Sequence, residues 1–158
     1  MNDFLYKSPL GILKIIAVDN KVTRISFLHS QSEKQKKPDH FISTVIKKLD
    51  AYFNDHHKPL DFEMNAEGTA FQKKIWRLLL AIPVGTTVSY HKLAQTYGNV
   101  KAIRAIGAAI GKNPIAIAIP CHRVIGSDGN LVGYAGGLDK KKALLEHENV
   151  LIQKSLDL

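Results

Sequence analysis

One cysteine in the sequence is surrounded by residues that could make it reactive. Cys121 lies in the segment Pro120-Cys121-His122-Arg123. A cysteine attacks as its thiolate and has an ordinary pKa of about 8.5, so a cation at His122 or Arg123 could stabilise the anion. His122 could also take the thiol proton if a carboxylate such as Glu148 orients its other ring nitrogen. The alternative is that Cys121 is a small buried side chain without chemistry.

The cysteine count limits the other kinds of site. Because Cys121 is the only cysteine, the chain can form neither an internal disulfide nor a multi-cysteine zinc site. We therefore expect no metal, no cofactor and a reducing compartment. Residues 1–4 lack the basic start of a signal peptide, and the longest apolar run, 115–119, is too short to span a membrane. The sequence predicts a cytoplasmic protein with no membrane partner.

The charge of the chain indicates a polyanionic partner. Lys and Arg number 22 against 14 Asp and Glu, which gives a net charge of +8. Such an excess is typical of proteins that bind nucleic acid, with a membrane surface as the second candidate. A basic protein with neither partner would show the same charge.

The elements that must position Cys121 fall into two predicted domains. In residues 1–28, short β-branched runs alternate with turn residues, which predicts a small antiparallel sheet. Apolar residues at helical spacing over 39–55 predict an amphipathic helix that covers one face of it, after a polar loop at 29–38. We interpret residues 1–66 as an α/β scaffold, which makes the expected fold class α+β.

Residues 67–152 predict a second domain that is mainly helical. Thr69 begins a capping-box pattern, which opens a helix. Ser89 can cap a short helix at 90–97. Asn99 can cap the next, at 100–110, and two short helices joined by a glycine-containing turn indicate a helix-turn-helix.

The rest of this domain contains the elements expected directly before and after Cys121. The apolar run 115–119 predicts a strand that runs directly into Pro120. A tight turn is expected at 127–130, and a last amphipathic helix at about 139–149.

The second helix of the pair has an unusual composition. Lys101 and Arg104 lie three apart and therefore on one face, among the small residues Ala102 and Ala105. A basic face of small residues could enter the narrow minor groove of DNA. The alternative is that the small residues permit tight packing against a neighbouring helix while the two cations are solvated.

The cysteine segment, extended to Val124, strongly resembles the active-site motif of the methylated-DNA–protein-cysteine methyltransferases, also called O6-alkylguanine-DNA alkyltransferases. The resemblance runs without a gap from about Phe71 to Glu148, whereas residues before it share only the strands-then-helix plan. It includes Val88-Ser89-Tyr90, Lys112-Asn113-Pro114, Gly133-Tyr134-Ala135-Gly136-Gly137, Lys141 and His147-Glu148. It implies an RNase H-like first domain and a winged-helix-like second domain.

The resemblance implies a role for each matching position. Cys121 matches the cysteine that accepts the alkyl group in one displacement. His122 matches the histidine that takes the thiol proton through a water, and Glu148 the glutamate that holds it. Asn113 matches the asparagine that ties the helix-turn-helix to the active-site segment. Arg104 matches the arginine that fills the base stack after the damaged nucleotide swings out.

Other matching positions would bind the DNA and the base. Tyr90 matches the tyrosine that touches the flanking phosphate and protonates the leaving guanine. Tyr134 matches the wall of the base pocket, although filling the core is the alternative for either tyrosine. The full set of expected contacts comprises Arg104, Tyr90, Lys101, Ala102 and Ala105 on the DNA and Tyr134, Val124, Ala135, Gly136 and Arg123 in the pocket. Ala135 stands where the family often has serine, and Asn149 where glycine often follows the glutamate.

The resemblance implies DNA repair by a monomer that needs no cofactor. O6-alkylguanine in double-stranded DNA would transfer its alkyl group to Cys121 irreversibly, once per molecule, and the sequence leaves open whether O4-methylthymine is also repaired. Two other interpretations are a winged-helix DNA-binding regulator with a structural Cys121 and a Cys-His hydrolase, which would need an oxyanion hole.

Overall fold

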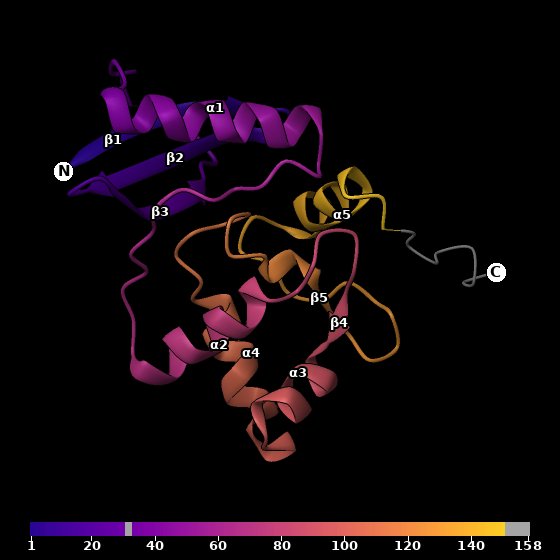
Figure 1. The fold of residues 1–158 in the computed structure, drawn as a ribbon. Helices are drawn as coiled ribbons and strands as arrows, with labels where there is room; N and C mark the ends of the chain where they lie inside the picture. Colours follow the sequence, from indigo (N-terminus) through magenta and orange to yellow (C-terminus); the bar gives the residue numbers. More distant parts are fainter. Residues whose placement is uncertain (31–32, 151–158) are drawn as a thin grey trace. The chain divides into compact units, whose positions relative to one another are not determined.

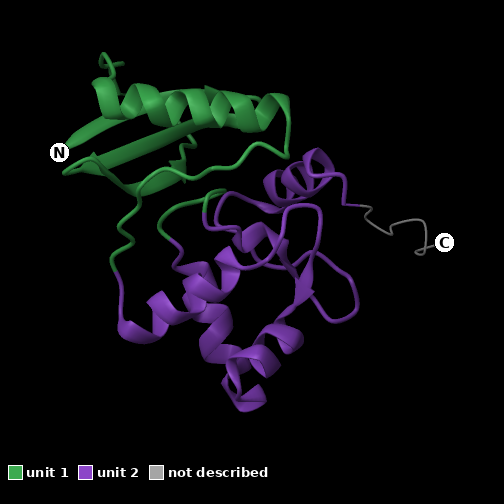
Figure 2. Ribbon diagram, in the orientation of Figure 1, with its two compact units in different colours: residues 1–67, 114–118 green, residues 68–113, 119–158 purple. Residues whose placement is uncertain are grey.

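The computed structural model describes residues 1–30 and 33–150 (Figure 1). They form two compact units, one of residues 1–67 with 114–118 and the other of residues 68–113 with the described residues from 119 onward (Figure 2). Each unit contains strands and helices, so the predicted α+β class is confirmed. The domain boundary expected after residue 66 stays a prediction, and residues 151–152 of the second domain lie outside the described residues.

The first unit contains the predicted antiparallel sheet. Its strands are β1 (Asn2–Ser8), β2 (Gly11–Val18) and β3 (Lys21–Phe27), which lie in the order β1-β2-β3. Asp19 and Asn20 join β2 to β3 with φ angles of 52° and 56°. Two successive left-handed residues suit the twist of a tight hairpin, and Asp and Asn tolerate that conformation well.

A single helix covers one face of this sheet. Helix α1 (His40–Asn54) begins after Asp39, whose side chain accepts a hydrogen bond from the backbone N–H of Ile42. Figure 1 shows α1 running along the sheet. The residues that α1 buries recur at helical spacing: Ile42, Val45, Leu49 and Tyr52. The predicted amphipathic helix is therefore confirmed.

The strand predicted at residues 115–119 is wrong. Ile115 makes one isolated parallel bridge to Ile25 of β3, and the following residues turn. Ile117 has a φ of 72°, in the left-handed region that β-branched residues rarely adopt. The apolar side chains are buried nevertheless, with Ile115 and Ile117 at most 2% exposed. A short apolar run reports burial and does not distinguish a strand from a buried turn.

The second unit begins with helix α2 (Ala70–Leu80). The predicted capping box is present, because the Thr69 and Gln72 side chains each bond the other residue's backbone N–H. Trp76 is buried, and its indole N–H donates to the carbonyl of Ala109 at 2.9 Å. This bond fixes α2 against the helix that contains Ala109.

The helix-turn-helix follows. Helix α3 (Tyr90–Tyr97) is capped by Ser89 and ends at Gly98, which has a φ of 103°. The second helix was expected to start at residue 100. It instead begins with a 3₁₀ turn, η1 (Val100–Ala102), before α4 (Ile103–Gly111). A 3₁₀ first turn is common at helix N-termini.

The cysteine segment is a short 3₁₀ turn, η2 (Cys121–Arg123), which continues into β5 (Val124–Ile125). Strand β5 pairs in parallel with β4 (Val88–Ser89), directly before α3. The turn expected near residues 127–130 is present, and the last helix is α5 (Leu138–His147). The β4–β5 pair therefore joins the segment after Cys121 to the start of the helix-turn-helix.

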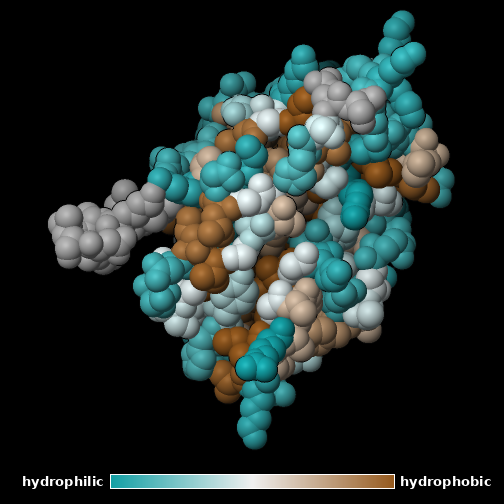
Figure 3. Space-filling view, turned by 180° about the vertical axis from the view of Figure 1, so that it is seen from behind, coloured by the Kyte–Doolittle hydropathy of each residue, from teal (hydrophilic) through white to brown (hydrophobic). Residues whose placement is uncertain are grey.

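The next observations concern hydrophobic residues, first in the helices and then on the surface. None of the helices in residues 1–30 and 33–150 is long and apolar enough to cross a membrane. Figure 3 shows hydrophilic side chains over much of the face in view, with hydrophobic ones in small groups among them. Two exposed hydrophobic residues, Val132 and Leu138, flank the loop that contains Tyr134.

Candidate active site

Cys121 is held by an asparagine at the end of the helix-turn-helix. The side-chain amide of Asn113 donates to Cys121 Sγ at 3.1 Å and to the carbonyl of Ile119 at 2.8 Å. Asn113 lies two residues beyond α4, so one side chain connects the end of α4 to both the backbone before Cys121 and the sulfur itself. Cys121 is buried, with 9% of the residue exposed.

The surroundings of the sulfur have opposing effects on its ionisation. Burial raises the pKa of the Cys121 thiol, while the hydrogen bond from Asn113 and the positive charge of Lys141 lower it. The effect of burial is the largest, and the pKa lies above its ordinary value. The thiol therefore keeps its proton at neutral pH, and a nucleophilic reaction at Cys121 requires a base.

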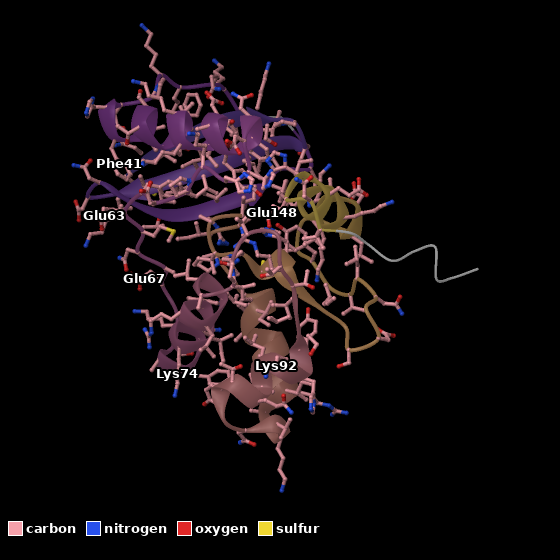
Figure 4. All side chains as sticks on the ribbon, turned by 45° about the vertical axis from the view of Figure 1, so that its right-hand side comes forward. Phe41, Glu63, Glu67, Lys74, Lys92 and Glu148 are labelled. Atoms are coloured by element: carbon pink, nitrogen blue, oxygen red, sulfur yellow. The ribbon has the colours of Figure 1, made fainter. Side chains whose placement is uncertain are left out.

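The next residue, His122, is bound to a buried carboxylate. Its Nε2 lies 2.8 Å from Glu148 Oε2, and both side chains are fully buried. Figure 4 labels Glu148 at the end of α5. Burial lowers the pKa of His122, although Glu148 raises it, so the ring is neutral at pH 7. An Nε2–H that donates to Glu148 leaves the lone pair on Nδ1.

The other ring nitrogen has the character of a base. His122 Nδ1 is buried and has no hydrogen-bond partner in the described part of the chain. A buried nitrogen lone pair with no protein donor is poised to accept a proton. The residue before it in sequence is Cys121 with its protonated thiol, so the two neighbouring residues are a candidate nucleophile and a candidate base.

Arg123 compensates the charge of Glu148. Its Nε and Nη2 donate to the two carboxylate oxygens at 2.8 and 3.0 Å, and its Nη1 donates to the carbonyl of Ile82 at 2.7 Å. A bidentate pair of this kind is strong and directional. It balances the charge of a Glu148 carboxylate and fixes its orientation. The sequence predicted Arg123 in the base pocket, and that role stays a prediction.

A buried lysine, Lys141, interacts electrostatically with the cysteine. Lys141 is fully buried, and its Nζ donates to the carbonyls of Val132 and Gly133 at 2.8 and 3.2 Å. Burial lowers the pKa of Lys141 to about 8, although the negative charge of a Cys121 thiolate would raise it. Tyr90 Oη also donates to the carbonyl of Val132, at 3.3 Å. The carbonyl of Val132 therefore accepts hydrogen bonds from both Tyr90 and Lys141, which links these two side chains to the loop after residue 131.

Sequence reasoning did not give Lys141 a role, although a signal was present. Lys141, Leu144, Leu145 and Glu148 occupy positions i, i+3, i+4 and i+7 of the last helix, which is its buried face. A lysine on an apolar face must satisfy its ammonium group inside the protein. The sequence cannot identify the carbonyls that do so.

Tyr134, in the loop after residue 131, interacts electrostatically with the same sulfur, as Tyr90 does. The charge of Cys121 contributes to a raised pKa at both Tyr90 and Tyr134, after burial as the larger cause. Both hydroxyls are therefore protonated at neutral pH. Gly133 has a φ of 59°, and the N–H of Gly137 donates to the carbonyl of Tyr134 at 3.0 Å. This tight turn leaves Ala135 exposed and Gly136 partly exposed.

The face of the second helix that the sequence marked as basic is exposed. Lys101, Arg104 and Ala105 are exposed and Ala102 is partly so, whereas Ile106 on the opposite side is buried. Neither cation has an ion pair with another described residue. The two cations are therefore solvated, as both interpretations expected, and DNA binding by this face stays a prediction.

The structure also accounts for one departure from the family pattern. Asn149 has a φ of 62° directly after Glu148. Asparagine is one of the few residues besides glycine that adopts this conformation at low cost. The helix can therefore end there without glycine, and Glu148 keeps its place.

Two family models match the chain. Residues 70–150 match the model described as 6-O-methylguanine DNA methyltransferase, DNA binding domain. Residues 3–66 match the ribonuclease-like domain of the same proteins. Together they cover nearly all of the described chain.

Individual relatives agree with these models. The methylated-DNA–protein-cysteine methyltransferase of Methanosarcina acetivorans is 40% identical over 150 residues, which cover 91% of this chain and 96% of that protein. The enzyme of the same name from Mycobacterium tuberculosis is 42% identical, covering 89% of this chain and 88% of that one. The crystal structure of Mycobacterium tuberculosis OGT in complex with DNA has a TM-score of 0.81 and 42% identity, with coverage of 91% and 90%. By sequence and by fold, the chain belongs to the methylated-DNA–protein-cysteine methyltransferase family.

Proposed function

We propose that this protein repairs alkylated duplex DNA by moving the alkyl group of O6-alkylguanine onto Cys121 Sγ. The observation that carries the proposal is the protonated, nearly buried thiol of Cys121 next to the buried His122–Glu148–Arg123 network. Relatives that cover most of the chain are named for this transfer, and one of them has been crystallised with DNA.

The transfer is a single displacement. The thiol proton passes to His122 Nδ1, directly or through one water, while Sγ attacks the alkyl carbon. An S–C bond forms, the C–O6 bond breaks, and the bonding electrons stay on the guanine. Glu148 stabilises the imidazolium because its carboxylate lies 2.8 Å from His122 Nε2 and is held in place by Arg123. The thioether is not readily reversed, so each molecule reacts once.

The leaving guanine needs a proton. A purine oxygen leaves poorly as an anion, so protonation of the ring by Tyr90 lowers the barrier. The Tyr90 hydroxyl is protonated at neutral pH, as a proton donor must be, although burial raises its pKa and makes it a weaker acid. In the absence of a base this hydroxyl donates to the carbonyl of Val132. A bound guanine would replace that carbonyl as the acceptor.

Lys141 acts on the same group of residues without needing to touch the base. Its charge favours the Cys121 thiolate, and its bonds to Val132 and Gly133 hold the loop that leads to Tyr134. We assign it a positioning and electrostatic role. In this proposal the base packs against Tyr134, and backbone groups at Cys121, Val124, Ala135 and Gly136 read its edge.

The exposed face of the second helix would bind the minor groove. Lys101 and Arg104 supply positive charge, and Ala102 and Ala105 let the backbone come close to the groove floor. Arg104 would occupy the place of the extruded nucleotide. Asn113 connects this helix to the sulfur, so DNA binding and chemistry share one rigid connection. A monomeric state, a cytoplasmic location and independence of cofactors stay predictions from the sequence.

The proposal is tested by intact-protein mass spectrometry after incubation with a duplex that contains one O6-methylguanine. The parent protein is expected to gain one methyl group, and Cys121→Ala to gain none. An undamaged duplex is the matched substrate control. A regulator with a structural cysteine would bind the duplex without any mass change, and equal methylation of Cys121→Ala would contradict the proposal.

A further inference from the structure

A second cluster of chemically active side chains belongs to the first unit, and none of its residues is assigned to repair. Asp55, His56 and His57 follow the end of α1, and each offers one ligand atom. These three atoms lie within 4.8 Å of one another. His57 Nδ1 is 3.2 Å from Asp55 Oδ1, and the centroids of the two imidazole rings are 4.0 Å apart.

The donor set selects a class of ligand. Two imidazoles and one carboxylate suit borderline divalent cations such as Zn²⁺ and Ni²⁺, whereas Mg²⁺ prefers oxygen ligands alone. Zinc bonds to nitrogen and oxygen are about 2.1 Å long, so two ligand atoms on one ion lie roughly 3 to 3.5 Å apart. The His57–Asp55 separation of 3.2 Å already falls in this range. The ligand atom of His56 lies within 4.8 Å of the other two.

The local electrostatics favour a cation at this place. The C-terminal end of a helix has a partial negative charge, and the last turn of α1 contains no basic residue. A hydrogen bond from the backbone N–H of His57 is the main cause that lowers the pKa of Asp55, so its carboxylate is ionised at neutral pH. The positive charge of Lys58 also acts on Asp55, and it would repel a bound cation.

From these observations we propose that Asp55, His56 and His57 form a binding site for a divalent transition-metal ion, with water completing the coordination. The sequence predicted no metal because the chain lacks a second cysteine, but this donor set uses no cysteine. A bound ion would tie the end of α1 to the turn that begins at Asp55. It would therefore stabilise the first unit, independently of whether the repair function is correct.

The site is tested by isothermal titration of Zn²⁺ and Ni²⁺ into the full chain. Cys121→Ser serves as the parent protein, because the thiol would otherwise compete for the metal. The exposed His40, at the opposite end of α1, provides the matched control variant His40→Ala. We expect one ion per chain, about tenfold or greater loss of affinity in His56→Ala and His57→Ala, and no change in His40→Ala. Equal affinity in all four proteins, or no saturation below about 1 mM, would overturn the proposal.

A second measurement locates the ion. Cu²⁺ is paramagnetic and broadens the amide NMR signals of residues close to it, and it binds such ligands more tightly than Zn²⁺ does. Substoichiometric Cu²⁺ is expected to broaden the signals of residues 54–58 first. Broadening centred on another histidine, such as His91 or His122, would assign the binding elsewhere and reject this site.

Discussion

The two units of the molecule differ in their net charge and in whether they bury charged side chains. Residues 1–67 contain 10 Lys and Arg against 9 Asp and Glu, whereas residues 68–158 contain 12 against 5. The buried polar or charged residues of the described chain, His122, Lys141 and Glu148, all lie in the second unit. The first unit instead buries apolar side chains and keeps its ion pairs at the surface.

This difference separates a stabilising region from a reactive one. Burying a charge costs free energy unless hydrogen bonds compensate it, so proteins retain buried charges mainly where chemistry needs them. In the second unit, the Glu148–Arg123 ion pair and the hydrogen bonds of Lys141 to backbone carbonyls compensate the free-energy cost of burying these charges. Its excess of exposed positive charge suits a polyanion such as DNA. The following predictions test this division of roles.

The largest effect is expected from Glu148→Ala. Removing one partner of a buried ion pair leaves Arg123 uncompensated, which costs about 3 to 5 kcal/mol of unfolding free energy. His122 also loses its orienting group, so methyl transfer should slow by about 10² to 10⁴. Urea unfolding and single-turnover kinetics measure the two effects. The control is Glu146→Ala, which removes a partly exposed pair with Lys142 and should change stability by less than about 1 kcal/mol. Similar losses in both variants would remove the special role of the buried network.

A smaller effect is expected from Arg104→Ala. The variant should react about 10 to 100 times more slowly with methylated duplex DNA, because it loses the side chain that fills the base stack. Its rate with free O6-methylguanine, which needs no base flipping, should be nearly unchanged. Arg24→Ala replaces an exposed arginine of the first unit and should alter neither rate. Equal losses of Arg104→Ala on both substrates would exclude the base-flipping role.

The pH dependence tests the assignment of the base. Burial lowers the pKa of His122 below its ordinary value of 6.5, so the imidazole is neutral through the neutral range. The transfer rate should be constant from pH 7.5 to 6.5 and should fall about tenfold per unit once His122 is protonated at lower pH. Stability should decrease in the same direction, because the unfolded chain takes up this proton near pH 6.5 while the folded chain resists it. A rate that is already falling at pH 7.5 would exclude a buried, neutral His122 as the base.

The smallest effect is expected on the salt dependence of DNA binding. DNA affinity should fall steeply with salt concentration, and Lys101→Ala should reduce the slope of log K against log salt by about 1. Lys47→Ala in α1 provides the control and should leave the slope unchanged. Fluorescence anisotropy with an undamaged duplex measures both. An equal reduction in the two variants would mean that both units contribute phosphate contacts.

The sequence predicted the elements whose signals are local. Asp39, Thr69 and Ser89 each mark a helix start, and each accepts the expected capping hydrogen bond. The family motif indicated Cys121 and His122 because their order and spacing are part of the chain itself. Local chemistry of this kind does not depend on distant parts of the fold.

The features that sequence reasoning missed depend on contacts between distant residues. The run at 115–119 is as apolar as a strand, yet Ile117 takes a left-handed conformation because its backbone turns within the core. The two-residue strands β4 and β5 are too short to show a period. Arg123 reaches the carbonyl of Ile82 across 41 residues, and no pattern in the sequence encodes that bond.

The central claim, that Cys121 is the alkyl acceptor, is tested most directly by peptide mapping. The protein is incubated with excess duplex DNA that contains O6-methylguanine with a deuterated methyl group, and is then digested with trypsin. Cleavage after Lys112 and Arg123 releases residues 113–123, which contain the only cysteine. We predict one labelled methyl group on this peptide, with a yield that stops at one per chain. Label on any other peptide, or continued turnover without label on the protein, would contradict the assignment.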